Sequence, residues 1–244
     1  MTHTVRYVIK AVSMQTKFVA SAALILSGVG SLTPLMSHAH AADHDGQVWL
    51  TAAVNIDLAD RWGGVLEAQT RIGDDISTMK VSQFKGILLY DLTSTFSAGV
   101  GYGYMIANKP GGDIAENRIW QEVNWKIDSG DKNGLAFRTR LEERFFESGN
   151  DTGWRLRQRV KLTRPIRDGS STYLFGSGEF FFALNDTDWG ARDGFSESRL
   201  SAGIGARLSR MLKIEGGYLN QCKPKSAAED DMNHVLTLSL TTKL

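Results

Sequence analysis

The feature that most constrains this chain is an alternation of apolar and polar residues, which recurs in successive segments from Gln47 to Leu244. A period of two places successive side chains on opposite faces of a β-strand, whereas a helix needs a period of about 3.6 residues. In residues 154–162, for example, apolar positions alternate with Arg155, Arg157, Arg159 and Lys161. The sequence therefore predicts an all-β chain.

Eleven such segments can be counted, joined by connections that alternate between tight and longer, more polar ones. Their expected bounds are 47–58, 64–73, 79–91, 96–107, 116–128, 134–147, 154–167, 172–185, 196–209, 212–223 and 232–244. The third is the least regular, because apolar residues occupy both of its faces.

Segments of 10 to 14 residues favour an antiparallel up-and-down transmembrane β-barrel over a soluble sandwich, whose strands usually have about 5–6 residues. Short turns alternating with longer loops are typical of outer-membrane barrels. Aromatic residues near segment ends are expected to form the interfacial girdles, namely Tyr102, Tyr104, Trp125, Trp154, Tyr173 and Tyr218. Bacterial barrels normally have an even strand number, so eleven segments predict 10 or 12 strands.

The first 41 residues predict a secretory signal peptide. Basic residues precede a short apolar stretch at 18–26, and the small-residue pattern Ala39-His40-Ala41 predicts cleavage before Ala42. Translation from Met14 in place of Met1 would give a more ordinary signal length. The expected mature chain, 42–244, is then one barrel domain exported to the outer membrane of a Gram-negative bacterium.

Charge and cysteine content exclude several classes of protein. The 28 basic and 27 acidic residues are balanced, so no nucleic acid is an expected partner. A single cysteine, Cys222, excludes an intrachain disulfide framework and a multi-cysteine zinc site. No apolar run is long enough for a membrane-spanning helix. We expect no cofactor and no bound metal, and interpret the acidic runs at 74–75 and 229–231 as solvated loops.

The polar face of the predicted strands carries rows of arginine and glutamate. In a barrel these rows face the interior, since Arg or Lys facing lipid at mid-bilayer costs about 2–4 kcal/mol. If the turn at 129–133 sets Asp128 opposite Gly134, Glu122 faces Arg140 and Arg118 faces Arg144. The next hairpin then sets Glu142 opposite Arg159, which Glu179 also reaches. The expected lumen-lining residues are Glu67, Arg71, Arg118, Glu122, Arg138, Arg140, Glu142, Arg144, Arg155, Arg157, Arg159, Glu179, Arg199 and Arg207.

Several short motifs resemble a family of bacterial outer-membrane barrels that is catalogued only as a domain of unknown function. The matching residues are Trp49, Arg61-Trp62, Glu67, Arg71, Arg138-x-Arg140, Glu142, Arg144, Arg155-x-Arg157-x-Arg159, Pro165, Glu179, Arg199, Gly217-Tyr218-Leu219 and His234. The resemblance covers residues 45–244. It implies an outer-membrane barrel and brings no catalytic residue.

The leading hypothesis is therefore a non-enzymatic barrel, either structural or narrowly porin-like, whose Arg/Glu-lined lumen favours small anions. Its expected partners are outer-membrane lipid, lipopolysaccharide, and the barrel-insertion machinery through the C-terminal strand. One alternative is a barrel hydrolase in which His234 serves Ser177 or Ser201. The other is a soluble periplasmic β-sandwich or lipocalin-like protein that binds a ligand.

Overall fold

The computed structural model describes residues 43–128, 133–224 and 230–244. The predicted signal peptide lies outside these residues. The strands are β1 Asp43–Ala59, β2 Trp62–Gly73, β3 Thr78–Asp91, β4 Phe96–Ala107, β5 Ile114–Asp128, β6 Gly134–Phe146, β7 Thr152–Pro165, β8 Thr172–Ala183, β9 Gly194–Arg207, β10 Leu212–Lys223 and β11 Asp231–Lys243. The all-β prediction is confirmed, and each predicted segment corresponds to one strand.

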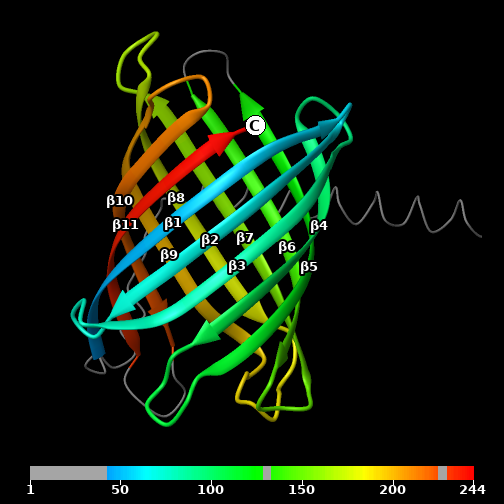
Figure 1. Ribbon diagram of the computed structural model, residues 1–244, viewed down its shortest axis with the longest axis vertical. Coiled ribbons are helices and arrows are strands. Elements are labelled where there is room, and N and C mark those ends of the chain that lie inside the picture. The colour runs from blue at the N-terminus through cyan, green and yellow to red at the C-terminus, as the bar shows by residue number, and fades with distance from the viewer. Residues whose placement is uncertain (1–42, 129–132, 225–229) are drawn as a thin grey trace, which may run out of the picture. The chain divides into compact units, whose positions relative to one another are not determined.

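The strands form a closed barrel in which each strand pairs with its neighbours in the chain (Figure 1). Ten pairings are antiparallel, and the eleventh, between β1 and β11, is parallel. The prediction of an even strand number was therefore wrong. In an up-and-down sheet with an odd number of strands the first and last run in the same direction, so a parallel pair must close the ring.

This closing seam is continuous along the strands. Its register runs from Asp43 opposite Asp231 to Asn55 opposite Lys243. Beyond it, the Leu244 amide donates to the Asn55 carbonyl at 2.8 Å, and the Asp57 amide donates to the Leu244 carbonyl at 3.1 Å. The seam leaves no open sheet edge, which is the condition for a sheet to lie within lipid.

The outer face of the barrel is apolar, with exposed side chains such as Leu66, Phe84, Val100, Leu200 and Leu236. Aromatic rings lie near both ends of this face. Trp62 contacts Tyr90 and Trp125 stacks on Phe137 at one end, while Phe182 contacts Phe195 at the other. Such bands are typical of the two interfaces of an outer-membrane barrel.

Tyr173 is an exception to the predicted girdle. It is buried inside the barrel, where its hydroxyl donates to Glu215 at 2.9 Å. A Cβ at Gly205 would collide with the Tyr173 ring, so this glycine makes room for the ring. The other five predicted girdle aromatics are exposed.

The two ends of the barrel differ in their connections. At the end that we call the turn end, the connections are 60–61, 92–95, 129–133, 166–171 and 208–211. The opposite end, the loop end, holds 74–77, 108–113, 147–151, 184–193 and 224–230. Because the strand number is odd, β1 begins at the loop end and β11 finishes at the turn end. In the described part of the chain, no helix is long and apolar enough to cross a membrane.

The closing register can be tested by disulfide formation. Thr51 lies opposite Ser239 in the seam, so cysteines at both positions, in a Cys222→Ser background, are expected to form a disulfide. The boiled, non-reduced chain should then migrate faster than the reduced chain on a denaturing gel. As a control, cysteines at Thr51 and Lys243 should remain unlinked, because four residues separate them along the seam, about 13 Å. Equal crosslinking of both pairs would contradict the register.

Candidate functional site

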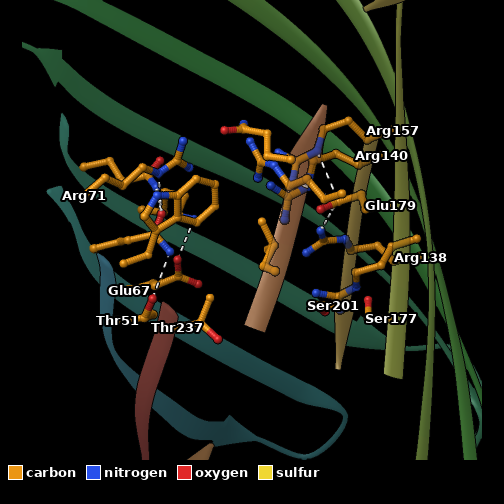
Figure 2. Close-up of a pocket in the computed structure, with 18 of the residues that line it drawn as sticks. Thr51, Glu67, Arg71, Arg138, Arg140, Arg157, Ser177, Glu179, Ser201 and Thr237 are labelled. Atoms are coloured by element: carbon orange, nitrogen blue, oxygen red, sulfur yellow. Dashed lines mark hydrogen bonds and ion pairs between the residues drawn. The ribbon is translucent and has the colours of Figure 1, made fainter. Parts of the chain in front are cut away.

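The interior of the barrel contains a polar cavity of about 500 Å³, which we call the lumen cavity (Figure 2). Among the described residues, twelve basic side chains line it: Arg71, Lys85, Arg118, Arg138, Arg140, Arg144, Arg155, Arg157, Arg159, Lys161, Arg199 and Lys223. Four glutamates also line it, namely Glu67, Glu142, Glu179 and Glu197. Three more, Glu116, Glu122 and Glu215, bind these cations from beside it. Twelve basic against seven acidic groups leave an excess of five positive charges.

Twelve of the fourteen predicted lumen residues line this cavity. Glu122 lies beside it and is buried, with one carboxylate oxygen accepting from Arg140 Nη2 at 2.5 Å and Nε at 2.7 Å. Arg207 is exposed at the turn end of β9, with its guanidinium 5.4 Å from the centre of the Tyr173 ring.

Glu142 is the most heavily shared acid of the lumen. Its side chain is 1% exposed, and it accepts hydrogen bonds from Arg155 Nη2 at 2.5 Å and Arg157 Nη1 at 2.5 Å. Arg140 Nη1 lies 3.6 Å from the same carboxylate. One buried carboxylate therefore compensates parts of three guanidinium groups, which a planar forked cation allows.

Two further glutamates bridge arginines from different strands. Glu179 on β8 accepts from Arg157 Nη2 at 2.8 Å and from Arg138 Nη2 at 2.6 Å. Glu116 on β5 accepts from Arg118 and Arg144 Nε, both at 2.6 Å. Glu197, by contrast, binds Arg199 of its own strand at 2.5 Å. The network thereby links β5, β6, β7 and β8 through side chains as well as through the backbone.

The predicted registers were right in one hairpin and wrong in the next. Between β5 and β6, Asp128 is opposite Gly134, Glu122 opposite Arg140 and Arg118 opposite Arg144, as predicted. Between β6 and β7, Glu142 lies opposite Arg155, four residues from the predicted Arg159. Arg159 lies opposite Arg138 on one side and opposite Glu179 on the other.

Aromatic side chains inside the barrel, among them Trp49, Trp120 and Phe181, lie against guanidinium groups. Arg140 lies 4.4 Å from the centre of the Trp120 ring, and Arg71 lies 3.9 Å from that of Trp49. Phe181, which is fully buried, has Arg157 at 4.6 Å from its ring centre. Cation–π contacts stabilise a desolvated cation without adding negative charge.

The sequence did not indicate that these aromatic side chains lie inside the barrel. The glycines of β4, however, leave space for one of them. A Cβ at Gly101 would overlap the Trp120 ring, and one at Gly103 would press on it. These two glycines of β4 thus make room for one bulky neighbour inside the lumen. The bulky neighbour, Trp120, is 2% exposed.

The predicted list of lumen-lining residues also omitted several charged residues of the interior. Lys85 binds Glu67 at 2.5 Å, and Lys161 binds Glu215 at 2.8 Å. Glu116 and Glu197 are both buried. Each of them continues the inward row of its strand at a spacing of two, so strand parity would have found them.

At the loop end, the β8–β9 loop folds over the β6–β7 connection. The Trp189 ring stacks on Phe146 with centroids 4.3 Å apart, and its Nε1 donates to the Asp151 carbonyl at 2.8 Å. The amides of Asn150 and Asp151 donate to the Asp188 carboxylate at 2.8 and 3.3 Å, and these hydrogen bonds hold the pKa of Asp188 below its ordinary value. The loop is therefore ordered by specific contacts.

The serine–histidine alternative fails on geometry. Ser177 and Ser201 line the lumen cavity, whereas His234 is exposed on the outer face, where its ring nitrogens lie 2.6 Å from the Tyr218 hydroxyl and 3.0 Å from His44 Nδ1. The barrel wall separates the two groups. Within the described residues, no cluster of three or more His, Cys, Asp or Glu side chains is arranged to hold a metal ion.

The fit between Gly101 and Trp120 predicts a measurable cost of added volume. Gly101→Ala should destabilise the refolded barrel by about 1–3 kcal/mol, because overpacking forces Trp120 from its position. Urea unfolding followed by tryptophan fluorescence would measure this. Gly176→Ala is the matched control, since the nearest atom to its added Cβ is 3.9 Å away. Equal stability of the two variants would contradict the packing argument.

The shared carboxylate of Glu142 predicts a larger effect. Glu142→Gln leaves Arg155 and Arg157 buried without their main counter-charge, and removing one partner of a buried ion pair costs about 3–5 kcal/mol. Glu143→Gln alters the adjacent residue, which faces outward and accepts from Gln121 at 3.2 Å, and should cost less than about 1 kcal/mol. Denaturant unfolding of both variants in detergent would compare them, and a loss no greater for Glu142 than for Glu143 would refute the assignment.

Residues 46–233 match the family described as "Protein of unknown function (DUF2490)". An uncharacterized protein of Methylorubrum extorquens is 33% identical over 201 residues, which are 80% of this chain and 86% of the relative. Among solved structures, the NanC porin is similar with a TM-score of 0.48 and 10% identity, over 72% of this chain and 86% of that one. LpxR from Salmonella typhimurium is similar with a TM-score of 0.47 and 9% identity, over 74% and 83%. As the resemblance of its motifs implied, the chain belongs to the DUF2490 family of proteins of unknown function.

Proposed function

We propose that this protein is an outer-membrane barrel whose narrow lumen admits small anions in preference to cations. The observation that carries the proposal is the excess of five positive charges around the lumen cavity of about 500 Å³. Rings of Arg or Lys favour anions in pores because they create a positive potential in a confined space.

The distribution of glutamates around the arginines also supports a preference for anions. Most arginines of β5–β8 share a glutamate, so their fields are partly cancelled. Arg71 on β2 makes no ion pair with any described residue; its Nε donates to the Gln69 amide oxygen at 2.9 Å. The charge that a permeating ion meets therefore comes chiefly from the arginines that lack a carboxylate partner.

The size of the barrel supports a narrow path and not a wide one. Barrels of about eight strands are filled by their side chains, whereas those of 16–18 strands leave a wide aqueous channel. Here the large side chains Trp120 and Phe181 are fully buried within the lumen, and they occupy the side formed by β5–β8. We infer that the lumen is selective among small solutes.

The membrane placement belongs to the same proposal. Cleavage before Ala42 would release the barrel to the periplasm, and the C-terminal strand would be read by the insertion machinery. The turn end would then face the periplasm, as short turns do in bacterial barrels, and the loop end would face the lipopolysaccharide.

The experiment is a planar-bilayer measurement of reversal potential in a potassium chloride gradient. The purified protein should first show a mobility shift on heating, as a closed barrel does. The wild type should then give a reversal potential of the sign that chloride preference requires. Arg71→Gln should lower the chloride-to-potassium permeability ratio about twofold, since a unit charge about 10 Å from an ion in water contributes about 0.4 kcal/mol.

Arg192→Gln provides the matched control, because it removes the same charge from an exposed loop residue whose side chain is 75% exposed. This variant should keep the wild-type ratio at physiological salt, where exposed charges are screened. Absence of conductance at every voltage, or a preference for potassium, would refute the pore and leave a purely structural barrel.

A further inference from the structure

Two arginines of the lumen lie directly opposite each other on adjacent strands. Arg138 on β6 and Arg159 on β7 are register partners, and both line the lumen cavity. Like charges placed directly opposite each other on adjacent strands destabilise a sheet, so this pair needs a compensating charge.

The donors of the two guanidinium groups are largely unused. Arg138 gives one hydrogen bond, from Nη2 to Glu179 at 2.6 Å, while its Nε is buried without a hydrogen-bond partner. Arg159 forms neither a hydrogen bond nor an ion pair with any residue in the described ranges. A buried cationic N–H without an acceptor is unfavourable, and such a group indicates an acceptor that is external to the chain.

The neighbouring carboxylate does not supply that acceptor. Glu179 lies opposite Arg159 in register, but the carboxylate oxygen that binds Arg138 also accepts from Arg157 Nη2 at 2.8 Å and Nε at 3.2 Å. Three guanidinium groups therefore surround one negative charge. The deficit of negative charge is local to this part of the lumen.

Two hydroxyl groups complete the arrangement. Ser177 on β8 and Ser201 on β9 are register partners and line the cavity, and Figure 2 draws them on the same side of the cavity as Arg138 and Glu179. Neither hydroxyl is bonded to another side chain of the described residues. Four contiguous strands, β6 to β9, thus present guanidinium and hydroxyl donors toward one space.

We propose that Arg138, Arg159, Ser177 and Ser201 form a binding site for a tetrahedral oxyanion, namely the phosphate or sulfate group of a small solute. The inference rests on the proposed anion preference of the same lumen and assigns that preference a ligand. Paired guanidinium forks match the several oxygens of such a group, whereas chloride offers only one accepting atom. A divalent anion between the two arginines attracts both guanidinium groups and so offsets the repulsion between them.

The test uses sodium sulfate and sodium phosphate as probes on the full mature barrel, refolded in detergent in a chloride buffer. Titration calorimetry and thermal unfolding should both detect binding, since a ligand of the folded state raises its stability. Arg159→Gln should weaken binding about tenfold or more, which is the loss expected for charged hydrogen bonds. Arg159→Lys keeps the charge but loses the forked guanidinium group. Its affinity for sulfate should lie between that of the wild type and that of Arg159→Gln.

Arg207→Gln is the matched control. It removes the same charge from the inward row of β9, but from an exposed position at the turn end, six residues from Ser201 and about 20 Å away along the strand. Its sulfate affinity should stay within about twofold of the wild type, the difference expected from a distant charge. If Arg159→Gln fails to refold, the double variant Ser177→Ala with Ser201→Ala tests the site without changing its charge, and it too should weaken binding.

The measurements distinguish failure of the proposed binding site from failure of the proposed pore. Sulfate binding that Arg159→Gln abolishes, in a barrel that carries no current, supports the site and refutes the pore. Chloride-selective current without sulfate or phosphate binding supports the pore and overturns the site. Wild-type affinity in Arg159→Gln, or an equal loss in Arg207→Gln, overturns the site as well.

Discussion

Closure of the sheet is the constraint on which the rest of this structure depends. Backbone amides and carbonyls within a bilayer have no water to bond, so a spanning sheet must pair every strand on both sides. Here the ring is completed by pairing β1 with β11 in parallel. Once the ring is closed, every strand has one face toward lipid and one toward the lumen, and the alternation of the sequence becomes a division between two environments.

The division concentrates charge in a confined space, where it must be compensated. Glutamates such as Glu142 and Glu179 each serve more than one arginine, and the Trp120 and Phe181 rings cover further guanidinium groups. Because aromatic contacts stabilise cations without cancelling them, the interior can be well packed and still carry a positive excess. The packing of the barrel and its proposed preference for anions therefore have the same origin.

The sequence predicted which residues share a face more reliably than which residues are neighbours. The turn at 129–133 is short enough to determine the β5–β6 register, and Glu122 was correctly placed opposite Arg140. The β6–β7 register was wrong by four residues. A shift by an even number keeps every side chain on its own face, so the hydrophobic pattern cannot detect it. Tyr173 shows the converse: it has the parity of the inward Glu179, but its aromatic character suggested the lipid interface.

By itself, the sequence determined the strands, their two faces and the enclosure of an arginine-rich row, because a period of two and the cost of charge in lipid act locally on each strand. Only the tertiary structure decided that eleven strands close through a parallel seam, that Trp120 fills the space left by Gly101, and that the β6 partner of Arg159 is Arg138 in place of the predicted Glu142. These features depend on how far each strand slides past the next. That displacement is set by the packing of side chains across the lumen, which no single strand contains.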